Sequence, residues 1–245
     1  LHDQILIRQI KSNKNHISFS GRFSNDIGKK NTVSSLFNLL EKKKFLKNKK
    51  FQVKIKKNIP TQAGLGGGSM NAANILSFLI RKKIIKISKK ELKKISYSIG
   101  SDVILGLKNT NSILTSKNKI KNFINCKKIN ILVVKPNFGF STGDIYAKVR
   151  KFNKPKYSYP KASMFNLDYL KKQNNSLETV AFAKNNKMRI LKSYLESLPA
   201  TIFVRMTGSG SALVAYFKSK ENCDNAKKKF IKKYKNYWCI TSKTI

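Results

Sequence analysis

The stretch Pro-Thr-Gln-Ala-Gly-Leu-Gly-Gly-Gly-Ser-Met-Asn-Ala-Ala, residues 60–73, decides the fold, because it joins a strand pattern to a helix pattern through glycine. Apolar and polar residues alternate over 51–57, as in a half-buried strand, and Pro60 prevents that strand from continuing. Beyond the loop, apolar residues recur at helical spacing and predict a helix over 69–83. Glycine lets backbone amides approach an anion, and a helix start adds unpaired amides and the positive end of a dipole. The stretch therefore predicts a phosphate-binding loop.

Better-known glycine loops do not fit this stretch. A P-loop carries Lys and then Ser or Thr after its last glycine, whereas Gly68 is followed by Ser69 and Met70. A dinucleotide fingerprint that starts at Gly64 needs a sixth-position glycine, where Ser69 stands. A protein-kinase glycine loop joins two strands, but this loop opens a helix. A flexible linker is the remaining alternative, and it gives no reason for an Ala-rich amphipathic helix to start at the last glycine.

The composition is that of a globular chain, since 40% of the 245 residues are hydrophobic, enough for one large or two modest domains. No apolar run approaches the ~20 residues of a membrane span, and the N-terminus lacks signal-peptide features. We therefore expect a cytoplasmic protein without a membrane partner. Cys126, Cys223 and Cys239 show no paired spacing, which argues against disulfides and zinc, and the sequence identifies no metal ligands.

The chain is strongly basic, with 52 Lys and Arg against 11 Asp and Glu and a net charge of +41, a balance typical of nucleic-acid-binding proteins. Only six of these cations are arginine, however, and arginine is the residue that makes bidentate contacts to nucleic acids. Lysine is accompanied by abundant Asn and Ile, the mixture that AT-rich codons produce. We expect no nucleic-acid partner, and an RNA-binding protein is the alternative from a different class.

Hydrophobic periodicity predicts strands and helices that alternate along the chain. The first half contains strands over 4–10 and 15–20 as a hairpin or meander, a helix from Asn31, a helix that a Ser88–Glu91 capping box starts and Gly100 ends, and a strand over 111–116. After Cys126 come a buried strand over 131–134, a short helix capped by Ser141 or Thr142, helices over 177–198 and 219–234, and strands over 201–206, 211–217 and 237–241. This pattern predicts an α+β chain with domains at 1–125 and 126–245.

Five motifs resemble the GHMP kinases, in the order that this family has them and across nearly the whole chain. They are Lys30-Asn31-Thr32-Val33, Pro60 with Gly64-Leu65-Gly66-Gly67-Gly68-Ser69, Gly100-Ser101-Asp102-Val103, Ser141-Thr142-Gly143-Asp144-Ile145-Tyr146 and Thr207-Gly208-Ser209-Gly210. The resemblance implies the two-domain GHMP kinase fold with a ferredoxin-like C-terminal domain. It also implies phosphorylation of a small-molecule alcohol with ATP and Mg²⁺.

The triple glycine is most similar to the branch of this family that phosphorylates the 2-hydroxyl of diphosphocytidyl methylerythritol in non-mevalonate isoprenoid synthesis. Members that act on mevalonate, homoserine or a sugar typically carry a double serine after fewer glycines, which speaks against them, and they are the second alternative. As partners we expect the small-molecule substrate and either no second subunit or a second copy of the chain.

The resemblance also assigns roles to individual residues. It implies that Asp102 is the catalytic base or the group that orients the acceptor hydroxyl. For ATP it implies the loop residues Pro60, Gly64, Leu65, Gly66, Gly67, Gly68 and Ser69, together with Lys57 and an adenine wall made by Asn31 and Val33. For the substrate it implies Thr142, Tyr146 as a ring stacked on cytosine, and the loop Thr207, Gly208, Ser209 and Gly210. Alternative roles are a helix cap or turn for Asp102, a helix cap for Asn31, a core position for Tyr146 and an ordinary turn at 207–210.

The chain departs from the family's pattern in several places. Met70 replaces a second serine, Ile104 and Leu105 replace a proline and an aromatic residue, Lys30 replaces an aspartate, and residues 116–119 replace a glycine-rich segment. Family members open with a strand that carries Ala-Lys-x-Asn and then a His-x-Leu segment, and Leu1 follows the place of both. We therefore expect an N-terminally truncated sequence that lacks a lysine near the transferred phosphate.

Overall fold

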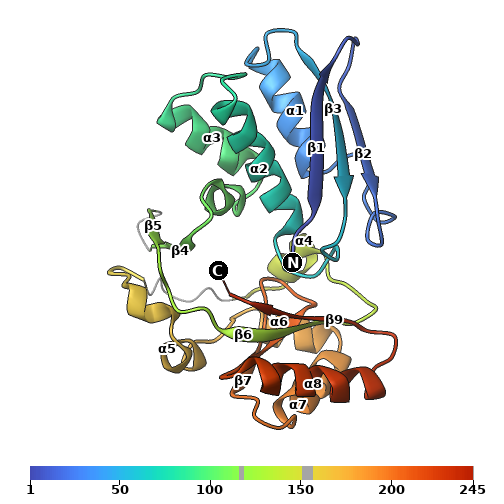
Figure 1. Ribbon diagram of the computed structural model, residues 1–245, viewed down its shortest axis with the longest axis vertical. Helices are drawn as coiled ribbons and strands as arrows, with labels where there is room; N and C mark the ends of the chain where they lie inside the picture. The colour runs from blue at the N-terminus through green and yellow to red at the C-terminus, as the bar shows by residue number, and fades with distance from the viewer. Residues whose placement is uncertain (116–118, 151–156, 245) are drawn as a thin grey trace. The chain divides into compact units, whose positions relative to one another are not determined.

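The computed structural model describes residues 1–115, 119–150 and 157–244 and divides the chain into two compact units (Figure 1). The first unit comprises Leu1–Thr61 and Gly66–Asn109, and the second comprises Gln62–Leu65 and Thr110–Ile245. The boundary that the sequence predicts at 125/126 thus falls inside the second unit. The glycine loop itself changes unit between Leu65 and Gly66. Residues 116–118, where the family has its glycine-rich segment, lie outside the described residues.

The sheet of the first unit has the order β1-β3-β2, formed by β1 (Gln4–Ile10), β3 (Lys50–Lys56) and β2 (His16–Ser20). Strand β1 is antiparallel to β3, and β2 is parallel to it. The predicted hairpin between the first two strands is therefore wrong. Phe51, Val53 and Ile55 of the central strand β3 are all buried, whereas β1 and β2 on either side of it are half-buried.

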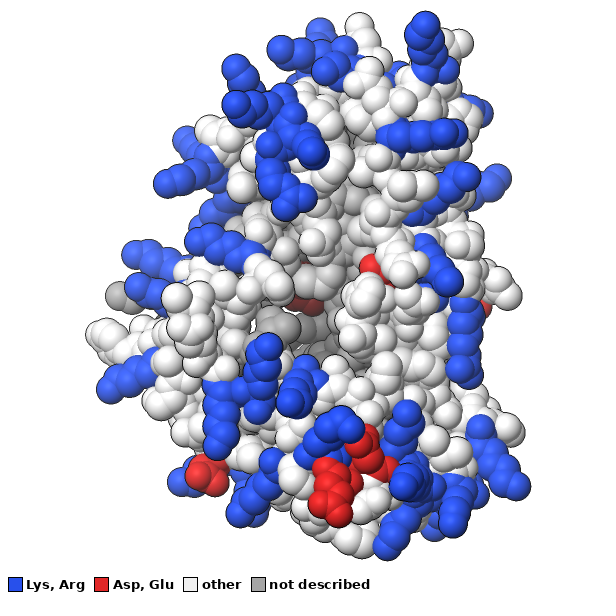
Figure 2. Space-filling view, viewed as in Figure 1, with Lys and Arg blue, Asp and Glu red and all other residues white. Residues whose placement is uncertain are grey.

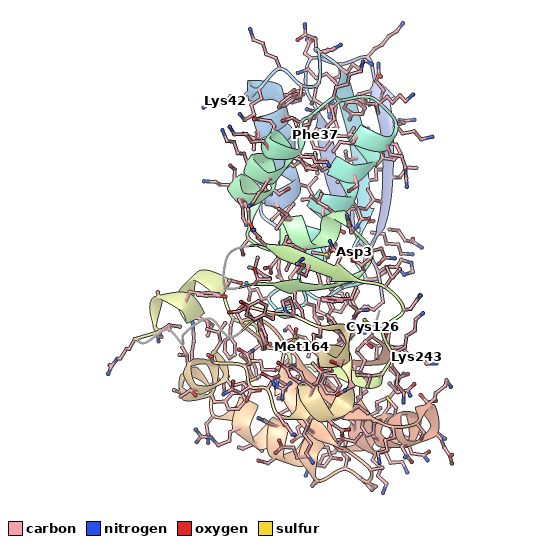
Figure 3. The ribbon with its side chains drawn as sticks, turned by 90° about the vertical axis from the view of Figure 1, so that its left-hand side faces the viewer. Asp3, Phe37, Lys42, Cys126, Met164 and Lys243 are labelled. Atoms are coloured by element: carbon pink, nitrogen blue, oxygen red, sulfur yellow. The ribbon has the colours of Figure 1, made fainter. Side chains whose placement is uncertain are left out.

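Three helices complete the first unit: α1 (Thr32–Lys42), α2 (Gly67–Arg81) and α3 (Lys89–Ile99). They cover one face of the sheet (Figure 1). The predicted apolar stripe of α1 is buried, and Phe37 points into the core while Lys42 points away from it (Figure 3). Ser88 caps α3 by accepting from the Glu91 amide, and Gly100 follows the last turn, as predicted. The short 3-10 helix η1 (Val103–Leu107) comes next and packs on α2.

The second unit is built on a four-stranded antiparallel sheet of order β7-β8-β6-β9. Its strands are β6 (Asn130–Lys135), β7 (Phe203–Met206), β8 (Leu213–Phe217) and β9 (Trp238–Lys243). Helices α6 (Glu178–Lys184), α7 (Lys187–Glu196) and α8 (Lys220–Lys233) pack on one face and form the core. With helices between β6 and β7 and between β8 and β9, this is the ferredoxin-like arrangement that the resemblance implied, and the α+β class is confirmed.

Smaller elements complete the second unit. They are the hairpin β4 (Asn111–Leu114) and β5 (Ile120–Phe123), and the short helices α4 (Thr142–Ala147), η2 (Ala162–Phe165) and α5 (Leu167–Lys171). Ser141 rather than Thr142 caps α4, because its hydroxyl accepts from the Asp144 amide. In the part of the chain that the structure describes, no helix combines the length and apolarity needed to cross a membrane.

The first half of the glycine loop covers the other face of the second unit's sheet. Ala63 packs with Val133, Ala212 and Val214 in a small apolar cluster. The Ser211 and Ala212 amides also donate to the Gln62 and Ala63 carbonyl oxygens at 3.2 and 3.1 Å. Residues 62 and 63 are thus bound to the segment just ahead of β8, which sequence periodicity does not reveal.

Lysine and arginine side chains are spread over the visible face of the molecule instead of collecting in one patch (Figure 2).

Candidate phosphate-binding and catalytic site

Helix α2 starts with amides that are free of any acceptor in the part of the chain that the structure describes. Gly66 precedes it in the left-handed conformation, with φ 68°, and no side chain caps the helix. The first amide with a helical bond is that of Met70, which donates to the Gly66 carbonyl oxygen at 2.9 Å. Among the described residues, the amides of Gly67, Gly68 and Ser69 meet no acceptor. Such a helix start can receive an anion, because its amides and its dipole favour negative charge.

The glycines of this first turn serve different purposes. A Cβ on Gly67 would lie 3.1 Å from Cγ2 of Ile59, and one on Gly68 would lie 3.0 Å from Oγ1 of Thr32, so both are needed for close packing. A Cβ on Gly66 would meet nothing within 4 Å, so that residue is needed for its backbone angle and borders open space. The loop is therefore a tightly supported turn with room on one side.

Asp102 lies in the turn between α3 and η1, with its side chain exposed. Its carboxylate makes no helix-cap bond, which removes the helix-cap alternative, and it accepts from Oγ of Ser101 at 3.4 Å. Ser69 is close to the same turn, since a Cβ on Gly100 would lie 3.7 Å from its Oγ. The structure thus brings the start of α2 near the turn that carries the candidate base.

Met70 packs against η1. A Cβ on Gly106 would lie only 2.7 Å from the Met70 sulfur. The chain therefore has an apolar contact between α2 and η1 at the position where the family has a second serine hydroxyl.

Asn31 caps α1, which is the alternative role that the sequence left open. Its side-chain oxygen accepts from the Val33 and Ser34 amides, both at 3.0 Å, and its amide donates to the Gly28 carbonyl oxygen at 3.0 Å. It also lines a cavity of about 570 Å³ together with Ile17, Phe19, Ile27 and Lys29. Val33, predicted as part of an adenine wall, is instead buried in the core, because its side chain belongs to the inward stripe of α1.

Lys57, which the resemblance assigns to ATP, is buried and forms an ion pair with Asp3. Burial by itself raises the pKa of Asp3, but bonds donated by Lys57, Ile59 and Asn71 outweigh burial and hold this pKa below its usual value. Pro60 is also buried and ends the link from β3. Sequence reasoning missed Asp3, since a single acidic residue near the N-terminus carries no motif.

In the second unit, the turn 207–210 is bound to Gly64. Oγ1 of Thr207 donates to the Gly64 carbonyl oxygen at 3.0 Å, and a Cβ on Gly64 would lie 2.1 Å from the Thr207 carbonyl oxygen. Asn175 holds the turn from its other side, with bonds of 2.7 Å to the Gly208 and 2.9 Å to the Met206 carbonyl oxygens. The turn is therefore a fixed part of the loop's support, and Asn175 had no signal in the sequence.

Two further predicted substrate residues lie on or near α4. Oγ1 of Thr142 is 3.0 Å from Oγ of Ser209, so the structure brings these two predicted positions together. Tyr146 is 51% exposed, which removes the alternative of a core position. Beside them, the bond from Lys184 is the main cause that lowers the pKa of Asp144, with the charge of Lys184 adding to it.

The described residues contain no group of three or more His, Cys, Asp or Glu side chains that could hold a metal ion by itself. A divalent cation at this site would need oxygen ligands from a bound phosphate.

Comparison with known families identifies the class of protein that this fold and site define. The model "GHMP kinases N terminal domain" matches residues 31–112, and "GHMP kinases C terminal" matches residues 162–236. The chain therefore belongs to the GHMP kinases and is a small-molecule kinase.

Relatives define the branch within that family. The chain is 53% identical over its 245 residues to the 4-diphosphocytidyl-2-C-methyl-D-erythritol kinase of Pelagibacter ubique, of which it covers 87%. It is 35% identical over 192 residues to the kinase of the same name from Petrotoga mobilis, covering 75% of this chain and 74% of the relative.

Solved structures confirm the fold. A crystal structure of 4-(cytidine 5'-diphospho)-2C-methyl-D-erythritol kinase matches 98% of this chain and 85% of its own length, with a TM-score of 0.72 at 20% identity. Homoserine kinase from Cytophaga hutchinsonii matches 99% of this chain and 85% of its own length, with a TM-score of 0.71 at 13% identity.

Proposed function

We propose that this chain transfers a phosphoryl group from ATP to the 2-hydroxyl of 4-diphosphocytidyl-2-C-methyl-D-erythritol, a step of non-mevalonate isoprenoid synthesis. The observation that carries the proposal is the start of α2, where the Gly67, Gly68 and Ser69 amides have no acceptor among the described residues. The acceptor is inferred from the 53% identity to a kinase of that name.

The residues at the start of α2 fit the phosphates of a nucleoside triphosphate. The amides of Gly67, Gly68 and Ser69 would hold phosphate oxygens, and Gly66 leaves the space beside them free of a side chain. ATP supplies the phosphoryl group that is transferred. The cavity of about 570 Å³ beside Asn31, whose apolar lining includes Ile17, Phe19 and Ile27, would receive the base of the nucleotide.

Mg²⁺ fits only as an ion held mainly by the nucleotide, since the described residues offer no cluster of acidic ligands. This is compatible with magnesium chemistry, because Mg²⁺ usually keeps several waters and binds through substrate phosphates. The hydroxyl of Ser69, in the first turn of α2, would be the loop's side-chain ligand for a phosphate or for the ion.

Asp102 acts on the hydroxyl of the substrate that receives the phosphoryl group. Its carboxylate is exposed and makes no cap bond, so an oxygen is available to accept the hydroxyl proton or to orient that hydroxyl for transfer. Ser101 steadies the carboxylate through its 3.4 Å bond.

The second unit supplies the candidates for substrate recognition. Tyr146 offers an exposed ring that can stack on a planar base such as cytosine, and the Thr142–Ser209 pair offers hydroxyls beside it. We place the enzyme in the cytoplasm, as a monomer or homodimer, with small molecules as its partners and neither nucleic acid nor membrane among them.

The test is an acceptor panel with the complete gene product, ATP and Mg²⁺, comparing diphosphocytidyl methylerythritol with mevalonate, homoserine and galactose. ADP release is measured, and the phosphorylated product is identified by ³¹P NMR. We expect turnover with the first acceptor alone. Turnover with another acceptor would make the chain a different GHMP kinase, and no turnover with any of the four would overturn the proposal.

The RNA-binding alternative is tested by thermal unfolding with ATP and Mg²⁺ or with a short RNA. A ligand that binds the folded state raises the unfolding temperature. We expect stabilisation by ATP at physiological salt, whereas RNA binding through many lysines weakens steeply as salt rises and is indifferent to ATP.

A further inference from the structure

Asp3 is a fully buried carboxylate that the proposed reaction does not use directly. Its side chain has 0% exposure and lies just ahead of β1 (Figure 3). One oxygen accepts from the Asn58 and Ile59 amides at 2.8 and 2.9 Å. The other accepts from Nζ of Lys57 and from Nδ2 of Asn71, the latter at 2.8 Å. Four donors thus converge on one carboxylate.

These donors come from two segments that meet at the phosphate-binding loop. Lys57, Asn58 and Ile59 form the link from β3 into the loop, and Asn71 lies in the first turns of α2. Ile59 in turn packs against Gly67, since a Cβ there would lie 3.1 Å from Cγ2 of Ile59. Asp3 therefore fixes both segments on either side of the glycines, from a residue more than fifty positions earlier in the chain.

The same carboxylate neutralises a buried cation below the helix start. Nζ of Lys57 would lie 3.3 Å from a Cβ on Gly67, close to the positive end of the α2 dipole. A buried ammonium in this position is costly unless it is paired. Without Asp3, Lys57 would have to leave the interior, and the Gly67 backbone packed on it would lose its support.

We propose that Asp3 is a positioning residue for the phosphate-binding loop, holding Asn58, Ile59 and Asn71 so that the first amides of α2 stay arranged to receive a polyphosphate. The part that concerns ATP rests on the proposed function. In this arrangement Lys57 acts through its pair with Asp3 and not by contacting the nucleotide.

The first experiment measures amide hydrogen exchange of peptides that cover residues 57–73, in the protein without nucleotide. Asp3→Asn removes the charge and is compared with Ile75→Val, which removes a buried methylene on the same helix away from the loop. We expect faster exchange over 57–73 in Asp3→Asn but not in Ile75→Val. Equal exchange in both variants would overturn the positioning role, whatever the protein does with ATP.

The second experiment measures steady-state kinetics with ATP. We expect Asp3→Asn to raise KM for ATP about tenfold, the effect of losing one charge-assisted hydrogen bond, while KM for the acceptor stays unchanged. Ile75→Val should lower the unfolding temperature and leave both KM values unchanged. If Asp3→Asn loses stability while its KM for ATP equals that of the wild type, Asp3 is only structural. If the wild type itself does not use ATP, the proposed function fails, and the exchange experiment still decides the role of Asp3.

Two more variants keep the proposal testable if Asp3→Asn misfolds, and they separate the role of Lys57 from that of Asn71. Asn71→Ala removes one of the four donors and leaves the ion pair, so a smaller rise in KM for ATP is expected. Unchanged kinetics and exchange in this variant would contradict the proposal. If Lys57 acts only through Asp3, Asp3→Asn combined with Lys57→Gln should show no higher KM than Asp3→Asn alone. A further rise would mean that Lys57 contacts the nucleotide.

Discussion

Gly64 and Gly66 share a left-handed backbone, with φ of 66° and 68°, but differ in the space around them. A Cβ at Gly64 would lie 2.1 Å from a backbone oxygen of Thr207, whereas one at Gly66 would meet nothing within 4 Å. We expect Gly66→Ala to lower the free energy of unfolding by about 1–2 kcal/mol, the cost of this backbone conformation for alanine. Gly64→Ala should cost clearly more, because the turn 207–210 must move. Denaturant unfolding of both variants checks this, and equal losses would contradict the predicted clash.

Asp102 and its neighbour Ser101 form a second matched pair. If Asp102 accepts or orients the acceptor proton, Asp102→Asn should lower kcat by about 10²–10⁴-fold with little change in KM for ATP. Ser101→Ala removes only the 3.4 Å bond to the carboxylate and should change kcat by a much smaller factor. Steady-state kinetics on both variants measure this. Full activity in Asp102→Asn would remove the residue from the chemistry.

The Asp3 carboxylate makes stability depend on pH. Burial raises the pKa of Asp3, but the bonds from Lys57, Ile59 and Asn71 together lower it by a larger amount. The pKa is therefore below the ordinary value of 3.8. The folded state therefore binds this proton less readily than the unfolded state, and the ion pair stabilises the fold above about pH 4 and is lost below it. We expect the difference in unfolding free energy between wild type and Asp3→Asn to be largest near neutral pH and to shrink in acid. Urea unfolding at several pH values measures it, and a constant difference would contradict this linkage.

At the scale of elements, the start of α1 separates a structural role from a binding role. Asn31 caps the helix and also lines the cavity assigned to the nucleotide base. Asn31→Asp preserves the cap and should keep stability, whereas Asn31→Ala should cost about 1 kcal/mol. We expect both to raise KM for ATP. Thermal unfolding and kinetics on the two variants test this, and an unchanged KM in Asn31→Asp would leave the residue as a cap alone.

The helices and strands were predictable where local pattern decides them. The stripe of α1, the Ser88 start of α3 and the strand before the glycine loop all follow from spacing and capping chemistry. Strand partners were not predictable, because alternation fixes which face of a strand is buried but not its neighbour. Strand β2 pairs with β3, more than thirty residues away, and this distant contact displaced the expected local hairpin.

The candidate site was predictable to the extent that it consists of contiguous motifs. The glycines, Asp102 and the turn 207–210 could be recognised because their spacing carries chemistry. Asp3 and Asn175 could not, since each acts through partners far away in the sequence. Val33 and Lys57 were assigned to the nucleotide by position, but burial directs one into the core and the other to Asp3.

At the scale of the whole molecule, the net charge of +41 affects stability. Like charges spread over the surface repel one another, and salt shortens the range of this repulsion from about 30 Å at 0.01 M to about 8 Å at 0.15 M. We expect the unfolding temperature to rise by several degrees between these two NaCl concentrations. Calorimetry measures this, with sucrose of equal osmolality as the control. An unfolding temperature that falls with NaCl would mean that attractive ion pairs dominate.

The chain passes from one compact unit to the other within the glycine loop, and this limits where the gene can be cut into fragments that fold. Neither compact unit is one continuous stretch of sequence, because residues 62–65 belong with the C-terminal part. A fragment that starts at Thr110 would leave Val133, Ala212 and Val214 without Ala63. Recombination between relatives at the 109/110 boundary would therefore combine the sheet of the second unit with residues 62–65 from a different parent. Chimeras that keep residues 62–65 and 110–245 from the same parent should be the ones that remain folded.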